Sequence, residues 1–367
     1  MRIIFFNALF VLVGVVILEI IFGTWIKGPD FGAMPLQKNL TLYFSVEDSY
    51  HGYRFVTNSR DSYALRGDYP SPERIDILTI GGSTTAELFV DDRETWSHLL
   101  GEKLTSISNT QTYVANAGVD GQSTVGHLWS FENWFPKIPG LSPKLVIVYV
   151  GLTDTLIGGD EDATWLPSPI RHLGNDAYLE AKQFVKNHSA LFHLYRVIKG
   201  AVKAKIHDAS HSDIDYKNAS WGPWGKDPYR QDCEEDQYQA YGSRLDKVVQ
   251  NIRALKAEPV LITQIYGSVR KRGGEIRYLG GDGIKPALVT LECINKTTID
   301  YCETKRLSCF DLANEISFEV GDHYDTTHTT PQGSERIATA IADWILDDRG
   351  LVASLGIVTN TDTKVSP

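Results

Sequence analysis

Short apolar runs that alternate with stretches of helical spacing are the feature that most restricts how this chain can fold. The expected strands are 75–80, 113–115, 145–150, 259–263 and 307–312. The expected helices are 95–104, 123–135, 238–255, 287–305 and 331–346. Short apolar strands between helices are typical of a parallel sheet that helices cover on both faces. The sequence therefore predicts an α/β protein whose functional site lies at the carboxyl ends of the strands.

The length and composition suit one large domain. The chain has 367 residues, and we expect the domain over 71–350, with an insertion at about 155–236 where the alternation stops. Residues 28–70 are expected to be irregular, and the small polar residues of 351–367 a flexible tail. The net charge of -10 leaves no general basic surface of the kind that nucleic acid requires, so no nucleic-acid partner is expected.

The first residues form a break in composition. Residues 3–26 are almost entirely apolar and approach the roughly 20 residues that a helix needs to cross a bilayer. We expect residues 1–27 to be a signal anchor with a transmembrane helix. The rest of the chain would then lie outside the cytoplasm, in the periplasm or at the cell surface. A cleaved signal peptide is the alternative, although residues 21–28 contain no small-x-small cleavage site.

Four cysteines lie in the second half of the chain: Cys233, Cys293, Cys302 and Cys309. None forms a CxxC pair, so no zinc site is expected. An even number in an exported chain permits two disulfides, whose pairing the spacing does not select. Free buried thiols remain the alternative.

Three expected strands end in residues suited to acyl transfer. Ser83 follows Gly81-Gly82 directly after the first strand, where a tight turn exposes a hydroxyl and backbone N–H groups. The second strand leads into a loop that ends at Gly121, and the strongest strand leads into Gly151-Leu152-Thr153-Asp154. Each of these segments alone is also compatible with an ordinary turn.

A fourth segment near the carboxyl end carries an acid and a base. Asp325 and His328 are three residues apart, just before the last expected helix. A serine hydroxyl needs a base to take its proton, and a carboxylate fixes the tautomer of that base. Asp322 and His323 are nearby competitors for the same roles.

Together the four segments resemble the blocks of the SGNH hydrolases, also called GDSL-like lipases and esterases. The resemblance covers about 75–155 and 236–346. It implies a flavodoxin-like three-layer α/β/α sandwich with a central parallel sheet, and no metal or organic cofactor. It also implies the catalytic residues Ser83, Asp325 and His328, and the oxyanion-hole residues Ser83, Gly121 and Thr153.

The chain departs from the family pattern at two positions. Gly82 stands where the family has Asp before the serine, and Thr153 stands where it has an Asn whose amide is an oxyanion donor. Loss of such a donor can lower the rate by about a hundredfold or more. Either the Thr153 hydroxyl takes over the role, or a neighbour such as Gln122 does, or catalysis is slow.

The expected function is ester hydrolysis, or acyl transfer to another hydroxyl, on an O-acylated envelope or secreted glycan. A lipid ester is the next candidate substrate. Trp221 and Trp224 in the insertion could stack on sugar rings, or could pack the insertion onto the domain. The alternative function is that of a catalytically silent glycan-binding or assembly protein on the same fold.

Overall fold

The computed structural model describes most of the chain outside the insertion. The described residues are 2–23, 25, 36–47, 49–108, 110–157, 185, 188–192, 194–195, 216, 218–226, 233, 238–273, 275–280 and 286–357. Most of the insertion expected at 155–236, and residues 358–367 of the expected tail, lie outside them. Two compact units can be distinguished, one made of 1–36 and 166–212 and the other of 37–165 and 213–367.

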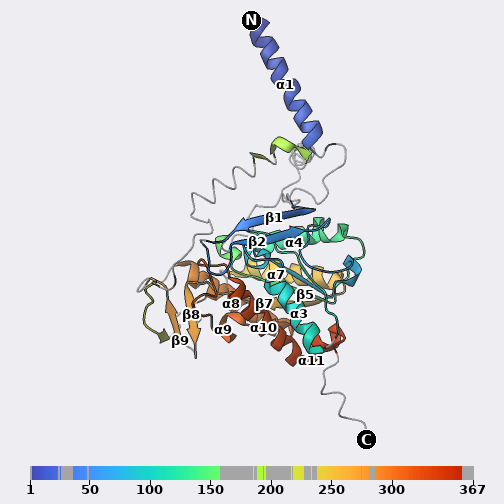
Figure 1. Cartoon of the computed structure of the whole chain (residues 1–367). Helices are drawn as coiled ribbons and strands as arrows, with labels where there is room; N and C mark the ends of the chain where they lie inside the picture. Colours follow the sequence, from blue (N-terminus) through green and yellow to red (C-terminus); the bar gives the residue numbers. More distant parts are fainter. Residues whose placement is uncertain are drawn as a thin grey trace. The chain divides into compact units, whose positions relative to one another are not determined.

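A five-stranded parallel sheet forms the centre of the larger unit (Figure 1). Its strands are β3 (Ile77–Gly81), β4 (Val114–Asn116), β5 (Leu145–Tyr149), β7 (Glu258–Ile262) and β10 (Ser308–Phe310). They lie in the order β10-β7-β5-β3-β4, which is the flavodoxin-like order 2-1-3-4-5 when read from the other edge. The predicted parallel α/β fold is thus confirmed, and all five predicted strands are present.

Helices cover the sheet. They are α3 (Trp96–Ser108), α4 (Thr124–Asn133), α7 (Gln239–Ala254), α8 (Pro286–Lys305) and α10 (Pro331–Asp347). Helices α3 and α10 pack together, and Leu100 and Ile341 on them share one core with Ile77 and Ile147 of the strands. Because successive side chains of a strand point to opposite faces, the equally buried Leu78 faces the other layer, where α7 contacts β7, α4 and α8.

Several elements were not expected from the sequence. Residues 28–70 were predicted to be irregular, yet β1 (Leu40–Ser45) and β2 (Phe55–Arg60) form an antiparallel pair. A second small sheet combines β6 (Gly225–Lys226), β9 (Glu275–Tyr278) and β8 (Val269–Arg272). Short helices also form at α2 (Ser83–Ala86), α9 (Leu312–Glu315) and α11 (Arg349–Leu355). The last of these means that the segment expected as a flexible tail begins with a helix.

The amino-terminal helix differs from the expectation. Helix α1 spans Arg2–Phe22, but no helix of the described residues is long and apolar enough to cross a membrane. The transmembrane helix expected over 3–26 is therefore not supported. The helix ends at Phe22 and carries Glu19 close to that end. The Glu19 carboxylate accepts hydrogen bonds from Ser189 Oγ at 2.7 Å and from the Ala190 N–H at 2.9 Å.

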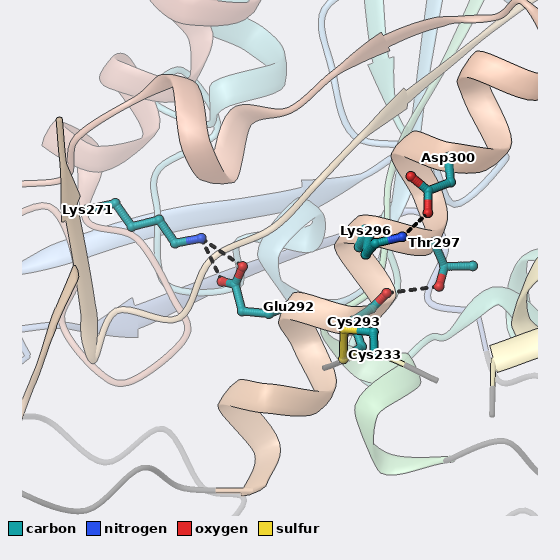
Figure 2. The surroundings of a disulfide bond; sticks show 7 residues. All are labelled: Cys233, Lys271, Glu292, Cys293, Lys296, Thr297 and Asp300. Carbon is teal, nitrogen blue, oxygen red and sulfur yellow. Dashed lines mark hydrogen bonds and ion pairs between the residues drawn. A yellow bond between two sulfur atoms is a disulfide. The ribbon is translucent and has the colours of Figure 1, made fainter. Parts of the chain in front are cut away.

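All four cysteines are paired. Cys233 is bonded to Cys293 in α8, and Cys302 at the end of the same helix is bonded to Cys309 in β10. Figure 2 shows the first bond beside Glu292, whose carboxylate lies 2.7 Å from the ammonium group of Lys271 in β8. Helix α8 is thus connected covalently to the insertion and to the edge strand of the sheet, and the alternative of free thiols is excluded.

Candidate active site

Ser83 lies at the carboxyl edge of the sheet, as its position after the first strand predicted. Strand β3 is flanked by β4 and β5, and α2 begins at Ser83 itself with Gly82 as its N-cap. The side chain of Ser83 is partly exposed, whereas the residues on both sides of it are buried. The nucleophile candidate therefore stands at the point where the strand order reverses, which is the usual ligand site of such sheets.

Ser83, His328 and Asp325 form one hydrogen-bonded chain. Ser83 Oγ lies 2.8 Å from His328 Nε2, and His328 Nδ1 lies 2.6 Å from Asp325 Oδ2. With a proton on Nδ1, the ring donates to the carboxylate and leaves Nε2 free to accept the serine proton. Ser83 and His328 are 245 positions apart in the chain, and they meet because both lie at the same edge of the sheet.

The turn around Asp325 explains why a spacing of three brings the acid to the base. The other carboxylate oxygen, Asp325 Oδ1, accepts the backbone N–H groups of Thr327 at 2.7 Å and of His328 at 2.6 Å. The hydroxyl of Tyr216 donates to the Asp325 carbonyl, and the ring of Tyr324 stacks on the imidazole at 5.7 Å between centroids. Backbone, hydroxyl and ring contacts together hold the imidazole toward Ser83.

Asp322 and His323, the competing pair, have other partners. Asp322 is fully buried, accepts from Gln332 Nε2 at 2.9 Å and lies 2.7 Å from Arg336 Nε. His323 is buried against the Phe318 ring, and burial lowers its pKa to about 3. A neutral imidazole in this position supports the packing of the loop. The structure thus places His328, and not His323, against the serine.

Thr153 lies beside Gly82, the residue before Ser83, which stands where SGNH hydrolases have Asp. A Cβ atom added to Gly82 would lie 2.8 Å from Thr153 Oγ1 and 2.9 Å from the Gln122 carbonyl oxygen. Both distances are too short for a side chain, so the two departures from the family pattern complement each other. Gly82 leaves the room that Thr153 occupies beside Ser83.

Gly121 and Gln122 differ in what they can offer to a substrate. Gly121 has φ +70° and no heavy atom within 4 Å of the place where a Cβ would be, so its backbone borders open space. Gln122 is buried, and its amide donates to Gly126 O at 2.9 Å and to Ser130 Oγ at 2.8 Å. The Gln122 side chain is therefore engaged inside the fold, which argues against it as the substitute oxyanion donor.

Asp154, next to Thr153, is structural. Its buried carboxylate accepts from the Thr124 N–H at 3.1 Å and lies 3.4 Å from Arg244 Nη2. Burial raises its pKa, while the Thr124 and Arg244 contacts oppose that rise. The carboxylate thus connects the loop after β5 to the first turn of α4.

Gln264 is a site residue that the sequence analysis missed. Its side-chain oxygen accepts the Leu152 N–H at 2.7 Å, and its amide donates to Thr84 Oγ1 at 2.6 Å. It therefore joins the loop that carries Thr153 to the turn that carries Ser83. Gln264 follows the predicted strand 259–263, so attention to every polar residue at a strand end would have found it.

The two tryptophans of the insertion stack on arginine side chains. The guanidinium of Arg277 lies 4.6 Å from the Trp224 ring and 5.2 Å from the Trp221 ring, and that of Arg270 lies 4.8 Å from Trp221. Tyr216 stacks on Trp221 as well. These contacts favour the role of packing the insertion onto the domain over that of a free platform for sugar rings.

No family model matches the chain, and no curated protein does. Solved structures that are similar to it include an acetylxylan esterase from Geobacillus stearothermophilus, at 12% identity, covering 77% of this chain and 94% of that one, with a TM-score of 0.40. A psychrotrophic esterase from a Pseudoalteromonas species is 12% identical, covers 74% of this chain and 97% of its own, and has a TM-score of 0.40. A GDSL-like lipase from Bacteroides thetaiotaomicron is 11% identical, covers 74% of this chain and 88% of its own, and has a TM-score of 0.36.

Such low identities and TM-scores leave the argument about function to the site itself. Four segments meet at one edge of the 2-1-3-4-5 sheet. They are a serine after the first strand, a glycine loop after the second, a polar loop after the third and an Asp-x-x-His turn before the last long helix. In this order and arrangement, the protein is similar to the SGNH hydrolases.

Proposed function

We propose that this protein is a serine ester hydrolase. Ser83 Oγ attacks the ester carbonyl carbon while His328 Nε2 takes the hydroxyl proton. The same imidazole then gives that proton to the leaving alkoxide as the carbon–oxygen bond breaks. Asp325 stabilises the imidazolium that forms between the two transfers. Water, activated by His328, then releases the acyl group from Ser83.

The hydrogen-bonded chain from Ser83 through His328 to Asp325 carries this proposal, with distances of 2.8 and 2.6 Å. The backbone N–H groups of Ser83 and Gly121 and the hydroxyl of Thr153 are the proposed donors to the developing oxyanion. A silent glycan-binding protein has no need of these hydrogen bonds between Ser83, His328 and Asp325, so the geometry favours an enzyme over that alternative.

A covalent probe gives the first test. A fluorophosphonate should label the wild-type protein and not Ser83→Ala, and a short-chain aryl ester should be hydrolysed by the wild type alone. His328→Ala should abolish turnover, whereas His323→Ala should retain most of it, because His323 does not contact the serine. An inactive His323→Ala that remains folded, beside an active His328→Ala, would show that the base has been misassigned.

The proposed location is outside the cytoplasm, in the periplasm or at the cell surface. Its support is the pairing of all four cysteines, because structural disulfides persist mainly in oxidising compartments. Fractionation of cells that produce the protein, with accessibility to an added protease as the readout, checks the location. A protein found only inside intact spheroplasts would contradict it.

The proposed substrate is an O-acylated glycan of the envelope or of secreted material, with a lipid ester as the second choice. The proposed location supports this, since such esters occur there. Release of acetate from an acetylated polysaccharide, measured beside release of long-chain acids from lipid esters, separates the two. Preferential hydrolysis of long-chain esters would favour the lipid. Transfer of the acyl group to an added sugar would indicate a transferase.

A further inference from the structure

Glu87 is a buried acid that the proposed reaction does not use. It terminates the short helix that begins at Ser83, and its N–H donates to the Ser83 carbonyl oxygen at 2.8 Å. Its backbone is left-handed, with φ +47°, a conformation that a side chain with a Cβ seldom adopts. Its carbonyl oxygen accepts from Arg66 Nη1 at 2.9 Å. The backbone of Glu87 therefore closes the turn that presents the nucleophile.

The carboxylate of Glu87 contacts the other side of the site. Its Oε1 accepts from the hydroxyl of Thr329 at 3.2 Å and from that of Ser334, while its Oε2 accepts the Trp96 N–H at 2.8 Å. Thr329 directly follows His328, and Ser334 lies in the first turn of α10. One side chain thus joins the loop of the base to two helices of the layer that α3 and α10 form.

We propose that Glu87 is a positioning residue that holds the Ser83 turn and the His328 loop at the distance their proton transfer requires. This inference rests on the proposed ester hydrolysis. The relevant contacts join residues 242 and 247 positions apart in the chain, and no described contact of Glu87 involves Ser83 Oγ or the imidazole itself. The carboxylate acts on the reaction only through the elements that it joins.

The surroundings of Glu87 make its charge sensitive to pH. Burial raises its pKa to about 7, while its hydrogen bonds and the nearby Arg66 guanidinium oppose that rise. The other titratable groups that face it are Tyr50, Tyr149 and Tyr324, which remain neutral because burial raises their pKa values. The protonation state of Glu87 is therefore the one that changes near neutral pH in this cluster.

Two variants separate the positioning role from simple loss of structure. Glu87→Gln keeps the shape and removes the ionisable group. Thr329→Val removes the hydroxyl by which the loop of the base contacts Glu87 at 3.2 Å and Ser334 at 3.1 Å. We expect Glu87→Gln to lower kcat for an aryl ester by about tenfold or more, since small misplacements of reacting groups are costly. KM should change by less than about twofold, because the side chain does not touch substrate.

The pH profile and a double-variant cycle complete the test. The profile of log kcat against pH should lose one titration near neutrality in Glu87→Gln. Thr329→Val should lower kcat in the same direction, and adding it to Glu87→Gln should cost less than it costs the wild type, because the two groups act through one contact. Glu335→Gln, on the exposed part of α10 where Glu335 pairs with Lys103, is the matched control and should match the wild type.

The outcomes are distinct. If Glu87→Gln is folded and has the kcat and pH profile of the wild type, the positioning role is wrong. If Glu87→Gln does not fold, an unchanged kcat in Thr329→Val leads to the same conclusion. A wild-type protein that is not labelled by the fluorophosphonate and hydrolyses no ester overturns the proposed function, and this inference with it.

Discussion

At the scale of single residues, Thr153 and Gly82 show how a departure from a family pattern can be accommodated. The Thr153 hydroxyl occupies the space that a side chain at position 82 would fill. An Asp at position 82 is thus incompatible with this Thr153 rotamer. The pair could not be predicted from the sequence, because the distance between the two loops depends on how β3 and β5 are aligned.

Thr153→Val tests whether that hydroxyl is an oxyanion donor. The variant keeps the shape and removes the donor, so kcat should fall by about 10- to 100-fold with little change in KM, as expected for a group that acts mainly in the transition state. Thr153→Asn, which introduces the amide that SGNH hydrolases have at this place, should keep or raise kcat. Steady-state kinetics on a small activated ester measures both. If neither variant alters the rate, position 153 lies outside the oxyanion hole.

Glu87 should also make stability depend on pH. Its pKa is about 7 in the folded protein, against 4.5 for an ordinary Glu. Between these values the folded state binds more protons than the unfolded state, so the free energy of unfolding falls as pH rises. The fall amounts to about 3 kcal/mol between pH 4 and 8. Urea unfolding at several pH values should show a smaller fall in Glu87→Gln, and an equal fall would contradict the raised pKa.

At the scale of elements, the central strands were predictable because they are buried on both faces. Strands β3 and β5 consist of buried residues throughout, so a continuous apolar run identifies them. The β1–β2 pair was missed because β2 carries polar side chains, with Asn58, Ser59 and Arg60 in succession. Strand propensity and hydrophobic periodicity do not identify β2, because its polar side chains are held by hydrogen bonds to distant parts of the chain.

Those polar side chains make the β1–β2 pair part of the site's support. Ser59 and Thr57 donate their N–H groups to Asp92 at 3.1 Å and Asp91 at 2.9 Å, in the loop that follows the nucleophile turn. Arg60 Nη2 donates to the Gly118 carbonyl at 3.1 Å, in the loop after β4. The segment predicted to be irregular thus stabilises the loop after the Ser83 turn and the loop that leads to Gly121.

The two disulfides should differ in their effect on stability. The Cys233–Cys293 bond closes a separation of 60 residues and the Cys302–Cys309 bond one of 7. The chain-entropy relation gives about 4 kcal/mol for the longer loop and about 2 kcal/mol for the shorter one. Paired Cys→Ser variants, compared by urea unfolding, should therefore rank in that order. A larger loss from the Cys302–Cys309 variant would contradict this ranking.

At the scale of the whole molecule, the site depends on elements from both ends of the larger unit. Ser83 follows β3, His328 precedes α10, and Gln264 follows β7 in between. The carboxyl ends of parallel strands lie at one edge of the sheet, so the edge at which Ser83 and His328 meet could be predicted. Contacts such as that of Gln264 with Thr84, 180 residues apart, could not, because they depend on side-chain packing across the finished sheet.

Removal of the amino-terminal residues tests where the functional molecule begins. The compact unit that contains the sheet and all the site residues starts at Gln37, so a chain that begins there should fold and keep the kcat of the full chain within error. A chain that begins at Asp61 lacks β1 and β2, and with them the contacts of Thr57, Ser59 and Arg60 to the site loops. It should melt at a lower temperature and lose most of its activity, as thermal denaturation and aryl-ester hydrolysis would show. Equal activity in both shortened chains would mean that the β1–β2 pair does not support the site.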